Sequence, residues 1–351
     1  PGSGDRGEAA APGRVAPGPK DRTDQGAGVH GASGAGFGKE GGVNIIEFGD
    51  CREIMRRWAM FGFKVQTCVT SPPYFGLRDY GHPDQLGLEK SPDEYVASMV
   101  EVFRCVRDLL ADDGTLWLNL GDSYNAHPGQ RKTTDKVGPK QETVRGSQAA
   151  PSRHVEGLKP KDLIGIPWRV AFALQADGWY LRQDIIWSKP NPMPESVTDR
   201  CTKAHEYIFM LSKSARYYYD SEAVKEPAVG GTSRGNGQRL AEQAISRTGG
   251  IISGGTAKST LGTSADETRN RRSVWNVATR PYKGAHFATY PPALIEPCIL
   301  AGAPAGGIVL DPFMGSGTTA QVATEHGRQY MGCELNPEYG ALQQERLKGV
   351  M

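Results

Sequence analysis

The stretch GIVLDPFMGSGTTAQVATEHGRQYMGCE, residues 307–334, decides the fold. It predicts an apolar strand over Gly307–Leu310, a glycine-rich turn, a helix over Thr318–Glu325 and a second strand over Tyr330–Glu334. Glycines at a strand-to-helix turn let the backbone approach a ligand closely, and the helix N-terminus offers free N–H groups to a carboxylate or phosphate. The stretch therefore indicates a ligand-binding α/β unit.

The glycine turn differs from the two common phosphate-binding loops. No Lys follows its second glycine, as a Walker loop requires, and its spacing departs from the dinucleotide fingerprint. Glu334, however, ends the next strand, where nucleotide-binding α/β folds hold ribose hydroxyls. A tight turn beside a solvated Glu is the alternative reading, and the two features together favour a binding site.

The rest of the chain continues this alternation of strands and helices. Outward from the decisive stretch, strands are expected over 43–48, 64–70, 115–120, 180–187 and 206–211, and helices after Asp50 and over 92–110, 165–177 and 291–301. Ser91 is a suitable N-cap, and Pro92 suits the first helical position. Such alternation predicts an α/β sheet flanked by helices.

A second motif, Thr70-Ser71-Pro72-Pro73-Tyr74, follows the expected strand 64–70. Prolines fix the backbone, so a side-chain oxygen and a carbonyl can both point at one amine, with an aromatic ring beside them to stack on a planar base. A Pro-Pro turn alone is more often structural. Together with the glycine motif it indicates a site for an amino group on an aromatic ring.

At these two motifs the sequence resembles the amino-methylating DNA methyltransferases of the bacterial restriction-modification type. Their catalytic motif reads (Ser/Asp/Asn)-Pro-Pro-(Tyr/Phe), and their cofactor motif reads Asp-Pro-Phe-x-Gly-Ser-Gly-Thr. Here Ser71 precedes Asp311, an order similar to that of the circularly permuted beta group. Further segments match in type and order: 47–50, 116–122, 187–191, 205–207 and 286–291.

The resemblance implies a seven-stranded, Rossmann-like, circularly permuted methyltransferase fold over residues 43–351, with S-adenosyl-L-methionine as cofactor. It implies that Ser71 and the Pro72 carbonyl accept hydrogen bonds from the target amine. Tyr74 would stack on the flipped base, with Pro73 completing the catalytic motif. The implied cofactor residues are Asp50 and Phe313 at the adenine, Glu334 at the ribose, and Asp311, Gly315, Ser316, Gly317 and Thr318 at the methionine part.

The implied reaction is direct in-line attack of an exocyclic amine on the methyl group, without a metal. In the family, Ser at the position of Ser71 goes mostly with cytosine-N4, which we therefore expect, and adenine-N6 is the alternative. A Pro-Pro-aromatic motif also serves methyltransferases that act on RNA bases or on glutamine side chains, which are a second alternative. In those enzymes the cofactor motif generally comes first, so the order in this chain argues against that alternative. A DNA-binding relative that has lost turnover is a further alternative, against which the intact motifs argue.

The cysteines point neither to a metal nor to covalent catalysis. The six are scattered without a CxxC pair, which fits reduced, mostly buried thiols. Methylation at cytosine carbon 5 uses a cysteine, usually in a Pro-Cys dipeptide, and Pro297-Cys298 is present. It lies within an expected apolar helix, so we interpret Cys298 as a core residue.

The net charge of +2 hides two basic segments. Residues 125–161 carry eight Lys/Arg against three Asp/Glu, and residues 221–285 carry ten against five. We expect the loop 125–161, with Lys132, Lys136 and Lys140, and a target-recognition insertion, 221–283, to contact DNA phosphates and bases. Solvated loops are the alternative. The candidate DNA contacts in the insertion are Arg234, Arg239, Arg271 and Arg272.

The first 42 residues hold 13 of the 45 glycines and few large apolar residues, which predicts a disordered leader. No apolar run is long enough for a membrane span, and no signal peptide is apparent. We therefore expect an intracellular protein, cytoplasmic or at the nucleoid in a bacterium. Its expected partners are double-stranded DNA and a cognate restriction endonuclease, and it would act as a monomer or a homodimer.

Overall fold

The computed structural model describes residues 43–79, 82, 84–125, 148–149, 154–228, 268–279 and 290–350. The expected leader, 1–42, lies outside these residues. So do most of the basic loop 125–161 and the greater part of the insertion 221–283, including Lys132, Lys136, Lys140, Arg234 and Arg239.

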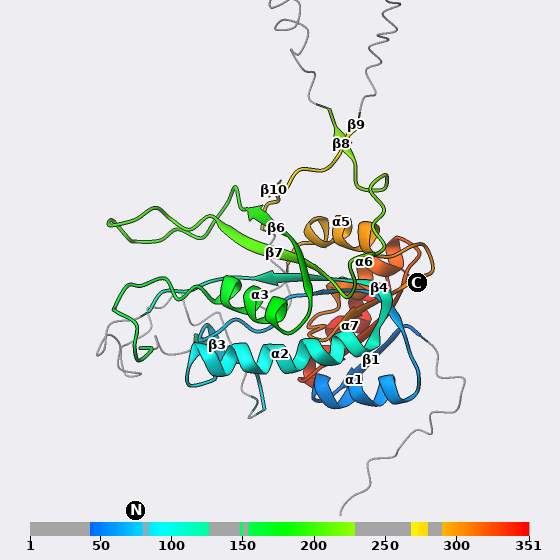
Figure 1. The fold of residues 1–351 in the computed structure, drawn as a ribbon, viewed down its shortest axis with the longest axis horizontal. Coiled ribbons are helices and arrows are strands. Elements are labelled where there is room, and N and C mark those ends of the chain that lie inside the picture. The colour runs from blue at the N-terminus through cyan, green and yellow to red at the C-terminus, as the bar shows by residue number, and fades with distance from the viewer. Residues whose placement is uncertain are drawn as a thin grey trace, which may run out of the picture. The chain divides into compact units, whose positions relative to one another are not determined.

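One mixed sheet forms the centre of the described chain (Figure 1). Its strands, in spatial order, are β1 (Ile45–Phe48), β12 (Gln329–Glu334), β11 (Ile308–Asp311), β2 (Val65–Thr70), β4 (Leu110–Leu120), β7 (His205–Ser212), β6 (Tyr180–Ser188) and β10 (Val274–Asn276). The first five run parallel, and β7 is antiparallel to both its neighbours. The first seven strands of this order are those expected, and the three-residue β10 adds an eighth from within the predicted insertion.

Helices cover both faces of the sheet (Figure 1). One layer contains α1 (Cys51–Met60), α2 (Pro92–Leu109) and α3 (Ile166–Ala176), and the other contains α5 (Pro292–Gly302), α6 (Thr318–Glu325) and α7 (Gly340–Leu347). Two short ribbons, β3 (Arg78–Asp79) with β5 (Gln148–Ala149) and β8 (Glu226–Pro227) with β9 (Thr268–Arg269), lie apart from the main sheet, and η1 (Pro337–Tyr339) precedes α7.

Local sequence explains where these elements begin. The Ser91 side chain accepts a hydrogen bond from the Glu94 N–H and Pro92 opens α2, as predicted. The run Val65–Thr70 is almost wholly buried, as expected for a parallel strand covered on both faces. Strand β4 begins at Leu110, earlier than the expected residue 115, and a register shift between Val65 and Thr67 absorbs the extra residues.

The strand order places a ligand site between β2 and β11. From β2 the chain passes through α2 to β4, whereas from β11 it passes through α6, on the other face, to β12. Adjacent strands whose connections leave in opposite directions open a crevice at their carboxyl ends, where α/β proteins bind ligands. Ser71 follows β2 and Asp311 ends β11, so both predicted motifs meet at this crevice.

Within the described residues, no helix is both long and apolar enough to cross a membrane.

Candidate active site

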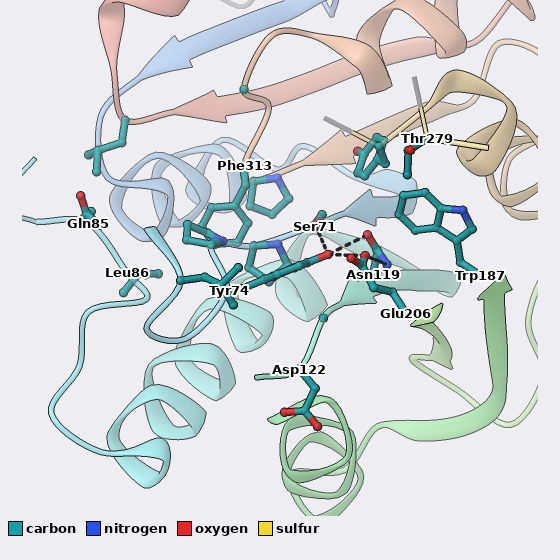
Figure 2. Close-up of a pocket in the computed structure, with 18 of the residues that line it drawn as sticks. Ser71, Tyr74, Gln85, Leu86, Asn119, Asp122, Trp187, Glu206, Thr279 and Phe313 are labelled. Atoms are coloured by element: carbon teal, nitrogen blue, oxygen red, sulfur yellow. Dashed lines mark hydrogen bonds between the residues drawn. The ribbon is translucent and has the colours of Figure 1, made fainter. Parts of the chain in front are cut away.

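A cleft of about 840 Å³ opens at the carboxyl edge of the sheet (Figure 2). Each wall comes from a different strand end: Ser71 follows β2, Asp122 follows β4, Trp187 lies near the end of β6, and Glu334 ends β12. Because β7 is antiparallel, Glu206 near its start reaches the same edge. Residues from distant parts of the sequence therefore share one cavity.

The Ser71-Pro72-Pro73-Tyr74 loop is held from behind. The Tyr95 hydroxyl of α2 donates to the Pro73 carbonyl at 2.9 Å, and the Gly76 N–H donates to the Gly87 carbonyl at 2.7 Å. Gly87 has a φ of +98°, and a Cβ there would lie 3.1 Å from the Tyr74 carbonyl oxygen. The loop is thus fixed by its own prolines and by its contacts with Gly87 and Tyr95.

The Tyr74 hydroxyl is the centre of a polar network on the cavity wall (Figure 2). It lies 2.9 Å from a Glu206 carboxylate oxygen and 3.1 Å from the Asn119 Oδ1, and the Ser71 hydroxyl lies 3.3 Å away. Asn119 in turn donates to the Tyr207 carbonyl at 3.0 Å. Burial, and then the Glu206 charge, raise the pKa of Tyr74 well above its usual value, so the phenol stays protonated and its ring orientation is fixed.

Glu206 is also paired with Lys189, which follows β6, and both side chains are 17% exposed. The Lys189 ammonium lies 4.2 Å from the centre of the Trp187 ring. The sequence segments holding Asn119, Lys189 and Glu206 matched the family pattern, but no role followed from the residues themselves. The signal that could have indicated Glu206 is an acidic residue near the start of the apolar strand β7.

The cofactor motif supplies a different part of the same cavity. Phe313 and Gly315 line it, as do Asp50 and Glu334. The Glu334 carboxylate accepts hydrogen bonds from the Gly315 N–H at 2.7 Å and the Asn336 N–H at 2.8 Å. Burial raises the pKa of Glu334 to about 7, although these N–H groups oppose the shift. Near neutral pH both the protonated and the ionised form of this carboxyl group are therefore populated.

Asp50 combines a helix cap with an ion pair. Its carboxylate caps α1 through the Arg52 N–H at 2.7 Å and contacts the Arg52 guanidinium at 2.5 Å. The hydrogen bond from Arg52 lowers the pKa of Asp50. The residue therefore presents an ionised, oriented carboxylate at the cavity edge.

Four of the predicted cofactor residues lie behind the cavity wall: Asp311, Ser316, Gly317 and Thr318 are not among the described residues that line it. Asp311 is 1% exposed and accepts hydrogen bonds from the Thr70 hydroxyl at 2.6 Å, the Thr319 hydroxyl at 2.5 Å and the Tyr290 hydroxyl at 3.0 Å. Burial raises the pKa of Asp311. In this structure Asp311 ties β2 to β11 and so couples the two motifs.

The other buried members shape the glycine turn. Gly317 adopts a left-handed φ of 86° before α6, and Gln343 of α7 donates to the Gly315 carbonyl at 2.7 Å. The Ser316 hydroxyl accepts a hydrogen bond from Arg346 at 3.1 Å. Helix α7, which the sequence did not suggest, therefore supports the turn from outside.

Cys298 is a core residue, as predicted. It is 1% exposed in α5, and its thiol donates to the Leu294 carbonyl at 3.7 Å. Burial raises the pKa of the Cys298 thiol, which opposes formation of a nucleophilic thiolate. All six cysteines are free, and only Cys201 is exposed.

The described ends of the predicted insertion form the β8–β9 ribbon. Glu226 accepts from Arg269 at 2.9 Å and from Arg272 at 2.6 Å, and the Arg271 guanidinium lies 4.7 Å from the centre of the Trp275 ring. Two arginines expected to face DNA, Arg271 and Arg272, thus have internal partners in this structure. Their roles in DNA contact stay a prediction.

Comparison with known proteins bears directly on this site. The model of the N6_N4_Mtase family, described as DNA methylase, matches residues 65–345. This chain belongs to the N6/N4 DNA methylase family. The match spans both the Ser71 loop and the Glu334 strand, and most residues that line the cavity lie within it, whereas Asp50 precedes the matched region. The family also confirms S-adenosyl-L-methionine as the methyl donor.

Several curated relatives are similar over most of their length. The Type II methyltransferase M.XycI of Xanthomonas campestris pv. cyanopsidis is 48% identical over 308 residues, which cover 88% of each chain. M.Cfr9I of Citrobacter freundii is 47% identical with the same coverage. M.SmaI of Serratia marcescens is 48% identical over 86% of this chain and 90% of its own.

Solved structures confirm the expected fold. The PvuII DNA methyltransferase (cytosine-N4-specific) superposes with a TM-score of 0.54 at 18% identity, covering 87% of this chain and 86% of its own. A putative DNA modification methylase from Thermus thermophilus, complexed with S-adenosyl-L-methionine, gives a TM-score of 0.51 at 21% identity, covering 88% and 95%. The Rossmann-like methyltransferase architecture is therefore established.

Proposed function

We propose that this DNA methylase transfers a methyl group from S-adenosyl-L-methionine to the N4 amine of cytosine in double-stranded DNA. The observation that carries the proposal is the position of Ser71. It begins a rigid Ser-Pro-Pro-Tyr loop in the cavity that also contains Gly315 and Glu334. In the family, Ser at this position goes mostly with cytosine, and the N6 amine of adenine is the second candidate for the methylated group.

The residues present fit the cofactor. The Glu334 carboxylate is a hydrogen-bond acceptor suited to ribose hydroxyls, and the Phe313 ring offers a face for adenine. Asp50 presents an ionised carboxylate toward the same region. When bound, the cofactor supplies a methyl group already activated by its sulfonium charge. Gly315 and Gly317 carry no side chain that could block the approach of the cofactor, Asp311 and Ser316 hold the turn through their hydrogen bonds, and Thr318 is buried at the start of α6.

On the base side, the chain provides orientation. The Ser71 hydroxyl and the Pro72 carbonyl accept hydrogen bonds from the amine, and Tyr74 stacks on the ring of the flipped cytosine. Because Glu206 and Asn119 fix the Tyr74 hydroxyl, the ring keeps one orientation before the base arrives. A near-attack geometry set in advance contributes the proximity term of catalysis, and the acceptors stabilise positive charge developing on the nitrogen.

The relatives named above are Type II methyltransferases, and we extend the proposal to a cognate restriction endonuclease that this methylation would counter. The basic segments 125–161 and 221–283 are proposed to contact DNA.

Incubating the purified protein with unmethylated genomic DNA and isotope-labelled S-adenosyl-L-methionine tests the proposal. The DNA is digested to nucleosides, and the labelled nucleoside is identified by mass. Label in N4-methylcytosine supports the assignment, whereas label in N6-methyladenine would keep the reaction class and replace the base. Absence of label in DNA despite cofactor binding would refute the proposal and favour a catalytically inactive relative.

A further inference from the structure

The connection between β6 and β7, residues 189–204, carries an apolar side chain that has no role in the fold. Met193 is 86% exposed, yet it lines the same cavity as Ser71 and Tyr74. In Figure 1 this connection extends as a long green loop beyond the end of the sheet. The exposure of Met193 in the free protein therefore needs an explanation outside the core.

Both legs of the connection are clamped at their bases. The Lys189 N–H donates to the Ala204 carbonyl at 2.8 Å. Asn191 and Thr279 exchange two hydrogen bonds: the Asn191 amide donates to the Thr279 carbonyl at 3.0 Å, and the Thr279 N–H donates to the Asn191 Oδ1 at 2.9 Å. These contacts fix the first leg of the loop immediately before Met193.

The outer part of the loop is held in a similar way. Glu195 accepts from the Arg200 guanidinium at 2.7 Å and from the Lys203 N–H at 3.1 Å. Arg200 also lies over the Tyr124 ring, 4.0 Å from its centre. The two legs are thus cross-linked on either side of Met193.

Prolines make the backbone around Met193 rigid. Pro192 and Pro194 flank Met193, each fixing its own φ, and the residue before a proline is restricted to extended conformations. A flexible apolar side chain on a stiff backbone can enter a narrow apolar space without a further loss of backbone freedom. Clamped legs and a rigid Pro-Met-Pro segment together are suited to insertion of the Met193 side chain.

We propose that Met193 inserts into the DNA duplex and fills the space that the target base leaves when it rotates into the cavity. The inference rests on the proposed function, because it needs a flipped base. The gap in the duplex is bounded by the apolar faces of the adjacent base pairs, and Met is among the side chains that proteins wedge between base steps. Its position at the cavity that receives the base places the wedge beside the base it replaces.

Two DNA substrates distinguish a wedge that supports base flipping from a general contact with DNA. The sites modified in plasmid DNA are first mapped by sequencing, and an oligonucleotide duplex is made around one of them. In the second duplex the nucleotide opposite the target base is abasic, so that flipping no longer breaks a base pair. Initial rates of methyl transfer give kcat/KM for both duplexes.

Met193→Ala should lower kcat/KM on the paired duplex about tenfold and on the duplex with the abasic partner less than about twofold, because the wedge matters where pairing opposes flipping. Met193→Leu should retain most of the rate, and Met193→Gln, similar in length but polar, should lose as much as the alanine variant. Met60→Ala is the matched control, since Met60 is 87% exposed at the end of α1 and does not line the cavity.

An unchanged rate for Met193→Ala on the paired duplex would overturn the wedge. So would an equal loss on both duplexes, which would indicate a general contact with DNA. In either case methylation of both duplexes by the wild-type chain would leave the proposed function standing. A wild-type chain that modifies no site in plasmid DNA at the mapping step would instead refute the proposed function, and the wedge with it.

Discussion

Gly121, which directly follows β4, lies against the ring of Tyr74, and this contact gives the sharpest test of how the base side works. A Cβ at Gly121 would lie 2.5 Å from the Tyr74 Cε2 and 2.9 Å from its Cδ2. Non-bonded carbon atoms pack at about 3.5–4.0 Å. In Gly121→Ala the ring must therefore retreat by about 1 Å, taking its hydroxyl away from Glu206 and Asn119.

The expected effect is on turnover. A misplacement of about 1 Å at a reacting group costs about 10²-fold in rate. We expect kcat to fall by about that factor, while the Kd for S-adenosyl-L-methionine changes less than about twofold, because the Glu334 carboxylate is held by the Gly315 and Asn336 N–H groups. Initial-rate kinetics with labelled cofactor measure the first quantity, and calorimetry measures the second.

Gly349→Ala is the matched control, because a Cβ at Gly349 has no atom within 4 Å. It should leave both quantities unchanged. If Gly121→Ala retained wild-type kcat with an unchanged melting temperature, the orientation of Tyr74 would not limit the reaction. An equal loss of cofactor affinity and turnover would refute the division of the cavity into two functional parts.

Three further predictions concern the cofactor side and the polar network. Because the pKa of Glu334 is raised from 4.5 to about 7, the folded protein binds this proton more tightly than the unfolded chain; the resulting stability is present below pH 4.5 and is lost as the pH rises through about 7. Cofactor affinity should change in the opposite direction and rise through pH 7 as the carboxylate forms. Glu334→Gln should flatten the pH profile of affinity, measured by calorimetry, and the pH profile of stability, measured by thermal unfolding. Profiles that the substitution leaves unaltered would contradict this prediction. Ser71→Ala should lower kcat about 10²-fold with unchanged cofactor affinity. Gly315→Val should abolish cofactor binding, because a β-branched residue does not tolerate the φ of 53° at this position. Equal loss of cofactor binding in both variants would show that the two roles are not separate. Glu206→Gln should lower kcat about tenfold, because it releases Tyr74 and leaves Lys189 unpaired. Adding Lys189→Met should recover part of that loss in the same kinetic assay. A double variant slower than Glu206→Gln alone would count against the pairing of Glu206 with Lys189.

Much of this architecture was predictable because local sequence determines it. Helix α6 occupies the expected Thr318–Glu325, and α2 begins at its expected cap. The glycine turn and the Pro-Pro loop are also local signals, and the structure brings Ser71, Tyr74, Phe313, Gly315 and Glu334 to one cavity.

The features that could not be predicted depend on how the strands pair and on how deeply each side chain is buried. Asn119 and Glu206 meet only because β4 and β7 pair antiparallel with Leu120 opposite Tyr207, a register that neither strand specifies alone. The burial of Asp311 behind the cavity wall likewise follows from three partners, Thr70, Tyr290 and Thr319, that come from separate segments. A motif identifies a residue as important without showing whether it faces the ligand or supports a neighbour that does.

The central claim is that an exocyclic amine held at the Ser71 loop accepts the methyl group, and a duplex lacking that amine tests it most directly. The target cytosine at a mapped site is replaced by 2-pyrimidinone, which keeps the ring and lacks the 4-amino group, and methyl transfer and DNA binding are measured beside the unmodified duplex. We expect the modified duplex to be bound and to accept no methyl group. Transfer into it at a comparable rate would place the acceptor atom elsewhere and would contradict the account.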